Sequence, residues 1–312
     1  MAGFLVTGGA GFIGSALVHR LVELGHSVRV VDNFSTGFRR NLEDCLGRIE
    51  LMEGDLAQLA LCKAAVQGVD YVLHQAAIPS VPRSVEDPIT SHRANATATL
   101  NLLVAARDAQ VKRFVFASSS SVYGDSETLP KVETMPENPL SPYALTKLAG
   151  EKYGAIFHRI YGLPAVSLRY FNVFGPRQDP HSPYSAVISR FVEAALQGTR
   201  PIVYGDGEQS RDFTYVDNVV EANLLACRAE GVGGMVFNIG TGQRQTLNEL
   251  LSSLHAIVGR QLKPEYSSPR VADVRHSQAG IEKARHFLGF EPKVDFQEGL
   301  KRTVDWYQKN AM

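Results

Sequence analysis

The sequence predicts an α/β protein, with a Rossmann-like, doubly wound parallel sheet and a smaller, mixed α/β lobe. Short apolar segments typical of buried strands alternate along the chain with segments of helical periodicity. The first apolar segment leads directly into a glycine-rich turn at residues 7–14. The length of 312 residues allows one large sheet domain and a second, smaller lobe.

The apolar segments predict the strands of the sheet, and the periodic segments predict its helices. Strands are expected at residues 4–6, 28–31, 49–52, 71–74, 114–117, 165–169 and, much later, 236–240. Helices are expected from about residue 12 to 24 and at 88–110, 142–161, 186–196, 247–258 and 296–308. Residues 211–216 are expected to form one further strand that returns toward the body of the protein.

The glycine-rich turn is typical of a dinucleotide-binding site. Gly8, Gly11 and Gly14 are spaced so that the backbone can turn tightly and approach a pyrophosphate. A helix that begins near Phe12 would point its free N–H groups at that anion. Asp32, at the end of the second strand, would accept both ribose hydroxyls and repel a 2′-phosphate, which favours NAD over NADP.

The composition excludes several other classes of function. Lys plus Arg equals Asp plus Glu at 32 each, so the broad positive field that nucleic acid or an anionic membrane requires is not expected. The apolar runs are too short to span a membrane, and the first strand begins too early for a signal peptide, which predicts a cytoplasmic protein. Cys45, Cys62 and Cys227 are scattered, which predicts reduced packing residues and no metal site.

Two groups of residues carry candidate chemistry. Tyr143 and Lys147 lie one helical turn apart, and a lysine ammonium beside a phenol lowers the pKa of that phenol toward the range of a usable base. The fifth strand ends in a run of serines at residues 118–121, whose hydroxyls would emerge beside the cofactor. A chance Tyr–Lys spacing, and serines that only cap a turn, would explain the same residues without catalysis.

Together these motifs resemble the extended short-chain dehydrogenase/reductase family, and within it the nucleotide-sugar 4-epimerases. The matching stretches span nearly the whole chain, at residues 7–14, 32–37, 54–56, 74–77, 119–124, 143–147, 169–177 and 211–213. The resemblance implies that Tyr143 is the base, that Lys147 lowers its pKa and contacts the nicotinamide ribose, and that Ser119 bonds the reacting hydroxyl. NAD is the implied cofactor.

The resemblance also assigns binding residues. The expected cofactor-binding residues are Gly8, Gly11, Phe12, Ile13, Gly14, Asp32, Asn33, Asp55, Leu56, Gln75, Ala76, Ala77, Asn95, Tyr143 and Lys147. The expected substrate-binding residues are Ser80, Ser119, Ser120, Asn172, Arg211, Arg270, Asp273 and Ser277. In this scheme Asp55 holds adenine and Asp273 accepts from the uridine ribose, while Asn95 supports the helix that carries the base.

The same resemblance predicts how the chain is divided and assembled. Residues 1–170 are expected to form the NAD-binding domain, completed by about 211–240, while 171–210 and 241–312 form the lobe that binds the UDP-sugar. Apolar faces left over on the helices at 88–110 and 142–161 predict a homodimer, although both helices could instead bury these faces on their own sheet.

The implied reaction is C4 epimerisation of a UDP-hexose through a transient 4-keto sugar. Related dehydratases and decarboxylases carry acids where this chain has Ser120 and Ser121, which argues against those reactions. Ser277 leaves room for an N-acetyl group, so UDP-GlcNAc/UDP-GalNAc and UDP-glucose/UDP-galactose are the expected pairs. Asp179 would repel a sugar carboxylate, which disfavours the main rival, UDP-glucuronate 4-epimerisation. A net NAD-dependent oxidoreductase and a noncatalytic NAD-bound regulator are two further functions that the same fold could serve.

Overall fold

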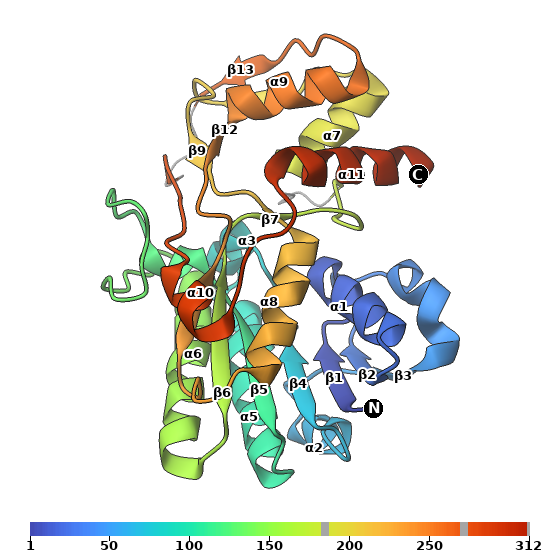
Figure 1. Cartoon of the computed structure of the whole chain (residues 1–312), viewed down its shortest axis with the longest axis vertical. Coiled ribbons are helices and arrows are strands. Elements are labelled where there is room, and N and C mark those ends of the chain that lie inside the picture. The colour runs from blue at the N-terminus through green and yellow to red at the C-terminus, as the bar shows by residue number, and fades with distance from the viewer. Residues whose placement is uncertain (182–186, 269–273, 311–312) are drawn as a thin grey trace.

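A seven-stranded parallel sheet in the order β11-β6-β5-β4-β1-β2-β3 forms the centre of the molecule (Figure 1). The structure is a computed structural model that describes residues 1–181, 187–268 and 274–310. The strands are β1 (Gly3–Thr7), β2 (Ser27–Asp32), β3 (Ile49–Glu53), β4 (Tyr71–His74), β5 (Arg113–Ser119), β6 (Ala165–Tyr170) and β11 (Val236–Ile239). The predicted strands of the main sheet are therefore confirmed.

Helices cover both faces of this sheet, as a doubly wound fold requires. One layer holds α1 (Phe12–Glu23), α8 (Val216–Arg228) and α10 (Glu282–Leu288), and the other holds α2 (Leu59–Ala65), α5 (Ala98–Asp108) and α6 (Pro142–Tyr161). Side chains of β1 alternate between the layers, because Phe4 and Val6 pack with the first and Leu5 with the second. The two apolar layers fix the sheet from both sides.

The helix predicted at residues 88–110 differs from the prediction in its interior. It consists of α4 (Pro88–His92), a π-helical turn η2 (Arg93–Thr97) and α5, which ends at Asp108. A π turn inserts one residue into the helix and rotates the side chains that follow it. The turn places Asn95 in the interior, 3% exposed, between the loop after β4 and α6.

The prediction of a single strand at residues 211–216 is wrong. The segment instead forms β9 (Ser210–Arg211), which pairs with β12 (Gln245–Thr246), and β10 (Thr214–Tyr215), which pairs with β7 (Val173–Phe174). Asp212 interrupts the strand because its buried carboxylate accepts backbone bonds from Thr241, Gly242 and Ala279 at 2.8, 2.9 and 3.1 Å. These bonds hold three distant segments together at one point.

A second group of elements lies beyond the carboxyl ends of the strands, at the top of Figure 1. Its apolar cluster is built mainly from α7 (Val187–Gln197), α9 (Leu247–Val258) and α11 (Phe296–Lys309). Beside it, β8 (Ile202–Tyr204) pairs in parallel with β13 (Glu265–Ser267). The predicted residue boundaries between two domains stay a prediction, although β11 does join the main sheet.

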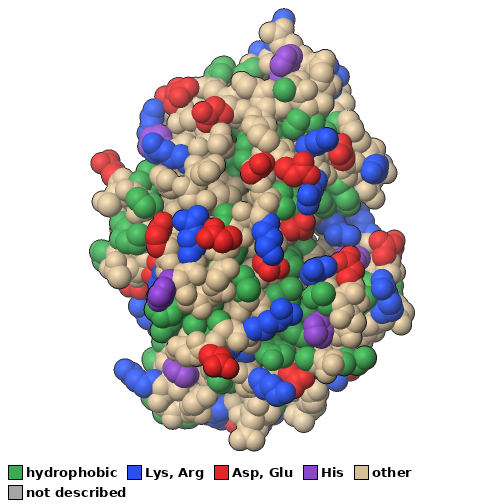
Figure 2. Space-filling model, viewed as in Figure 1, with side chains coloured by type: hydrophobic (Ala, Val, Ile, Leu, Met, Phe, Trp, Pro, Cys, Tyr) green, Lys and Arg blue, Asp and Glu red, His purple; other side chains and the backbone are tan. Residues whose placement is uncertain are grey.

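The surface and the cysteines match an ordinary folded chain. Figure 2 shows positive and negative side chains interspersed over the visible face, without a large area of one sign. None of the helices within the described residues has the length and apolarity needed to cross a membrane. Cys45, Cys62 and Cys227 are buried free thiols, as predicted for packing residues.

Candidate active site

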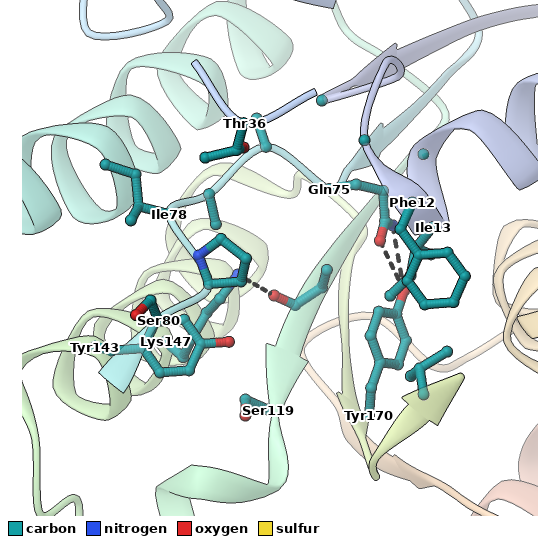
Figure 3. A pocket seen from close by; sticks show the side chains of 18 of the residues that line it. Phe12, Ile13, Thr36, Gln75, Ile78, Ser80, Ser119, Tyr143, Lys147 and Tyr170 are labelled. Atoms are coloured by element: carbon teal, nitrogen blue, oxygen red, sulfur yellow. Dashed lines mark hydrogen bonds between the residues drawn. The ribbon is translucent and has the colours of Figure 1, made fainter. Parts of the chain in front are cut away.

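A cavity of about 1410 Å³ runs along the carboxyl ends of the central strands (Figure 3). It is lined by the turn after β1, the ends of β2, β4 and β5, and the start of α6. All but one of the predicted cofactor-binding residues line it: Gly8, Gly11, Phe12, Ile13, Gly14, Asp32, Asn33, Asp55, Leu56, Gln75, Ala76, Ala77, Tyr143 and Lys147. The sequence motifs from distant segments thus meet in one space.

The glycine turn brings backbone, rather than side chains, to the cavity wall. Gly8 has a φ of +66°, and a Cβ there would lie 2.7 Å from the Cα of Ala76. A Cβ at Gly14 would lie 2.0 Å from the carbonyl oxygen of Gly8, so helix and turn can approach only without a side chain. No side chain caps the N-terminus of α1 at Gly11, and its first turn faces the cavity. This geometry suits a bound diphosphate.

Asp32 ends β2 with its carboxylate at the cavity wall. Its Oδ2 accepts from the Ala10 amide at 2.9 Å and its Oδ1 from the Phe34 amide at 2.8 Å, so the side chain is held in one orientation. Burial raises the pKa of Asp32, and these backbone bonds work against the rise. A carboxylate here can accept from ribose hydroxyls and disfavours a phosphate in the same place. The residues present therefore fit NAD.

Tyr143 and Lys147 project from the first two turns of α6 toward the end of β5. The helix begins where predicted because the Ser141 side chain caps it and Pro142 occupies its first position. Figure 3 shows Tyr143 beside Lys147, with Ser119 near the hydroxyl end of Tyr143. Lys147 donates to the carbonyl oxygen of Ala117 at 2.7 Å, and its Nζ lies 5.9 Å from the centre of the Tyr143 ring.

The electrostatics of this pair differ from the prediction. Burial raises the pKa of the Tyr143 phenol, and the interaction with Ser119 only opposes that rise. Burial also lowers the pKa of Lys147 to about 7. The prediction is that a lysine ammonium lowers the pKa of the phenol, whereas both groups are desolvated here and the lysine donates to a backbone carbonyl.

Asn95 is the predicted cofactor residue that does not line the cavity. Its side-chain oxygen accepts from the Ile78 amide at 2.8 Å, and its Nδ2 donates to the Thr146 hydroxyl at 3.1 Å. Thr146 in turn donates to the carbonyl of Tyr143 at 2.7 Å. The Asn95 side chain thus ties the loop after β4 to α6, in agreement with its expected support of the helix that carries the base, and it does not line the cavity.

The predicted substrate residues fall into two groups. Those that line the same cavity are Ser80, Ser119, Ser120, Asn172, Arg211 and Ser277. Arg270 and Asp273 lie outside the described residues, so their predicted contacts stay predictions. Ser277 is placed by its own amide, which donates to the carbonyl of Ser210 at 3.0 Å and so joins the C-terminal segment to β9.

Sequence reasoning missed three other residues of the cavity. Lys131 is 2% exposed and donates to the Ser126 carbonyl, while Arg177 has a positive φ of 66° and a pKa lowered by burial. The Ser121 hydroxyl is buried without a hydrogen-bond partner among the described residues. Ser121 lies in the serine run and Arg177 ends the matching stretch 169–177, whereas Lys131 had no signal because its position depends on how a distant loop folds.

The parallel sheet, glycine turn and cavity define the class of protein as an NAD-dependent Rossmann enzyme. Residues 4–240 match the NAD dependent epimerase/dehydratase family. The chain therefore belongs to this family.

Individual relatives agree with that assignment over nearly the full length. The crystal structure of UDP-glucose 4-epimerase from Thermotoga maritima with UDP-glucose superposes on this chain with a TM-score of 0.94. The two sequences are 41% identical, and the match covers 99% of this chain and 100% of the Thermotoga chain. UDP-N-acetylglucosamine 4-epimerase from Methanobrevibacter ruminantium, in complex with UDP-N-acetylmuramic acid, is 39% identical over 99% of both chains, with a TM-score of 0.95. The UDP-glucuronate 4-epimerase of Thermodesulfobacterium geofontis is 33% identical over 99% of this chain and 97% of its own.

Proposed function

We propose that this protein interconverts C4 epimers of a neutral UDP-hexose through a transient 4-keto sugar, with NAD held through the cycle. The observation that carries this proposal is the convergence of Ser119, Tyr143 and Lys147 in one cavity with the glycine turn. A cavity of about 1410 Å³ has room for a dinucleotide and a UDP-sugar together. The relatives that act on UDP-glucose and UDP-N-acetylglucosamine support the same reaction.

The proposed chemistry assigns one task to each residue. NAD⁺, when bound, supplies an oxidant that takes hydride from C4 and later returns it. Tyr143 removes the proton of the 4-hydroxyl and later returns a proton to the same oxygen. C4 is inverted because the 4-keto sugar turns over in between and presents its opposite face for the return of hydride. Ser119 holds the oxygen at C4 in reach of the phenol. The first turn of α1 would hold the diphosphate of the cofactor, and Asp32 would bind the adenosine ribose.

Tyr143 needs help to act as a base, because burial raises the pKa of its phenol. The positive charge of a bound nicotinamide ring would lower that pKa, as would a protonated Lys147. Lys147 has a pKa of about 7, so protonation of its amine near neutral pH costs little free energy. We therefore propose that the protonation state of Lys147 depends on the charge of its neighbours, and that its amine is protonated when the Tyr143 phenolate forms.

The cavity favours an uncharged hexose over a uronic acid. Asp179 lines it, and a second carboxylate nearby would be repelled. Ser277 lines the same space with a short side chain, which leaves room for an N-acetyl group. We propose UDP-GlcNAc/UDP-GalNAc and UDP-glucose/UDP-galactose as the two substrate pairs.

A substitution of Ser277 tests the assignment of the substrates. In Ser277→Tyr, the larger ring is expected to reduce turnover of UDP-GlcNAc at least tenfold, while turnover of UDP-glucose serves as the internal control and stays within about threefold. Proton NMR of C4 inversion measures both reactions in the same preparation. Equal losses on both sugars would show that Ser277 does not border the C2 substituent.

A second candidate reaction is C4 epimerisation of UDP-glucuronate. Lys131 favours it, because a buried amine with spare donor capacity lines the cavity and could attract a carboxylate. The candidate predicts turnover of UDP-glucuronate that falls in Lys131→Met, whereas turnover of UDP-glucose does not. Absence of turnover with UDP-glucuronate in the unmodified protein would remove this candidate.

We also propose that the protein works as a cytoplasmic homodimer. Leu145, Ile156 and Ile160 are exposed on α6, an apolar surface that suits a second copy of the same helix. Three free, buried thiols agree with a reducing compartment. Light scattering is expected to give twice the chain mass of 34.1 kDa for the native protein, and the single mass for Ile160→Glu.

A further inference from the structure

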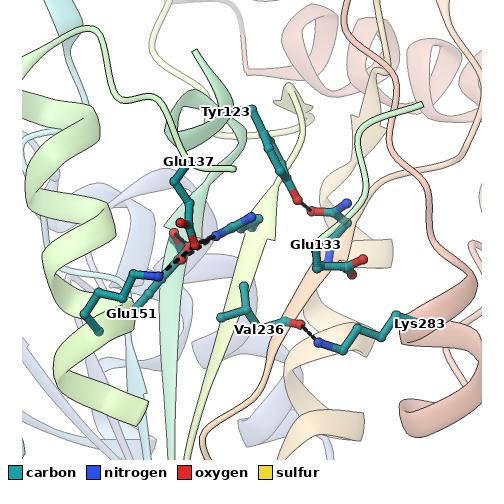
Figure 4. A network of polar contacts seen from close by, with 10 residues as sticks. Tyr123, Glu133, Glu137, Glu151, Val236 and Lys283 are labelled. Carbon is teal, nitrogen blue, oxygen red and sulfur yellow. Dashed lines mark hydrogen bonds and ion pairs between the residues drawn. The ribbon is translucent and has the colours of Figure 1, made fainter. Parts of the chain in front are cut away.

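A buried ion pair joins α6, the helix that carries Tyr143 and Lys147, to β6 (Figure 4). Arg169 on β6 and Glu151 on α6 are 1% and 2% exposed. The guanidinium donates to both carboxylate oxygens, from Nε to Oε1 at 2.9 Å and from Nη2 to Oε2 at 2.7 Å. The two side chains therefore form a planar, two-point contact that allows only one relative position of helix and strand.

The third member of this cluster is Ser118, on β5 between β6 and the rest of the sheet. Its hydroxyl donates to Glu151 Oε1, so one carboxylate holds both neighbouring strands. Ser118 directly precedes Ser119, whose hydroxyl faces Tyr143. The Ser118 bond thus acts within one residue of the group that binds the reacting oxygen.

Glu151 shares a helix face with the proposed base. Tyr143, Lys147 and Glu151 are each four residues apart on α6, and so lie in one line along the helix. Lys147 bonds the carbonyl of Ala117 and Glu151 bonds the side chain of Ser118, which attaches two successive turns of α6 to successive residues of β5. The position of α6 along β5 determines the distance between Tyr143 and Ser119.

The outer shell of the cluster restricts Arg169 further. Figure 4 shows Glu137 and Glu151 pointing toward the same place, and Arg169 Nη2 also lies 3.2 Å from Glu137. Lys152 bonds Glu137 at 2.8 Å and balances its charge. The Arg169 guanidinium packs over the ring of Tyr123, 4.6 Å from its centre. The cation is held on several sides.

We propose that Ser118, Glu151 and Arg169 are positioning residues that set the distance from Tyr143 to Ser119 for the reaction. The inference rests on the proposed catalytic roles of those two residues. A buried ion pair adds little net stability compared with apolar side chains, but its geometry is strict. Helix–strand packing through Leu and Val side chains tolerates small shifts, whereas a two-point charged contact does not.

Ser118→Ala tests the proposal, because it removes the link to β5 and leaves the ion pair in place. A displacement of a few tenths of an ångström at Ser119 is expected to lower kcat about tenfold. KM for UDP-glucose and the content of bound NAD are expected to stay within about twofold, since the Ser118 hydroxyl is engaged by the Glu151 carboxylate. Ser167→Ala is the matched control: Ser167 is a buried serine on β6, 3% exposed, outside this cluster.

Three outcomes separate the proposals. A fall in kcat for Ser118→Ala but not Ser167→Ala, with equal melting temperatures, supports the positioning role. An unchanged kcat, or an equal fall in both variants, overturns it. Tyr143→Phe is measured alongside, because turnover that survives in that variant would refute the proposed catalytic role itself. If Ser118→Ala does not fold, Ser118→Cys, which keeps the volume and weakens the donor, takes its place with the same criteria.

Discussion

Two buried cations on neighbouring elements behave in opposite ways. Lys147 and Arg169 are 4% and 1% exposed, and they lie on neighbouring elements, α6 and β6. Lys147 has a backbone carbonyl as its hydrogen-bond acceptor, and burial lowers its pKa to about 7. Burial alone would lower the pKa of Arg169 as well, but hydrogen bonding and charge from Glu151 raise it above its ordinary value.

The difference shows what a carboxylate partner does to a buried cation. Arg169 stays charged at every accessible pH and can serve only to hold the structure. Lys147 can gain or lose a proton near neutral pH, which is the property that proton chemistry requires. Glu151, the α6 residue that pairs with the fixed charge of Arg169, lies about one helical turn from Lys147, because the two are four residues apart.

The largest expected effect is on turnover when the variable charge is removed. Lys147→Met is expected to lower kcat roughly 10²–10⁴-fold. The Tyr143 phenolate loses its nearby ammonium, and the proposed contact of Lys147 with the cofactor ribose is lost as well. Lys63→Met, an exposed lysine on α2, is the control and should leave kcat unchanged. Steady-state kinetics with UDP-glucose measure kcat for both variants. A kcat of Lys147→Met within threefold of the native value would contradict the role in proton chemistry that distinguishes Lys147 from Arg169.

The next effect is on stability when the fixed charge is removed. Arg169→Met is expected to cost about 3–5 kcal/mol in urea unfolding, because it leaves the Glu151 carboxylate buried and unpaired. Replacement of the whole pair, Arg169→Met with Glu151→Leu, is expected to recover most of that loss. A double variant no more stable than Arg169→Met would show that the cost does not come from an orphaned charge.

The smallest effect is the contribution of Lys147 to the pH dependence of folding stability. Its pKa is about 7 in the folded protein and 10.5 as its ordinary value, so the unfolded chain binds the extra proton between these pH values. Folding stability from this group therefore rises from pH 7 toward pH 10 and is lowest below pH 7. Lys147→Met should melt at a higher temperature than the native protein at pH 6, with a smaller difference at pH 9. Parallel melting curves at both pH values would contradict the lowered pKa.

The sequence predicts well what local signals and burial determine. The helix at residues 142–161 has the bounds that the sequence predicts, because Ser141 and Pro142 start it and Gly162 ends it in a left-handed conformation. The central strands β1, β4, β5 and β6 are predictable because they are buried along most of their length and are largely apolar, whereas the edge strand β3 is only partly buried.

The sequence could not predict features that depend on distant segments. Asn95 is expected from the sequence both to contact the cofactor and to support the helix that carries the base; its bond to Thr146, 51 residues away, agrees with the second role, and its side chain does not line the cavity. Asp212 interrupts an apparent strand through bonds to segments 29 to 67 residues away. The opposite pKa shifts of Lys147 and Arg169 depend on which side chain folding places beside each cation, which periodicity does not reveal.

The most direct test of the proposed function uses the purified protein without added cofactor. It is incubated separately with UDP-N-acetylglucosamine and with UDP-glucose, and C4 inversion is followed by proton NMR. We predict inversion of both sugars by the NAD that the protein retains. No inversion of either sugar, even after NAD is added, would contradict the proposed function.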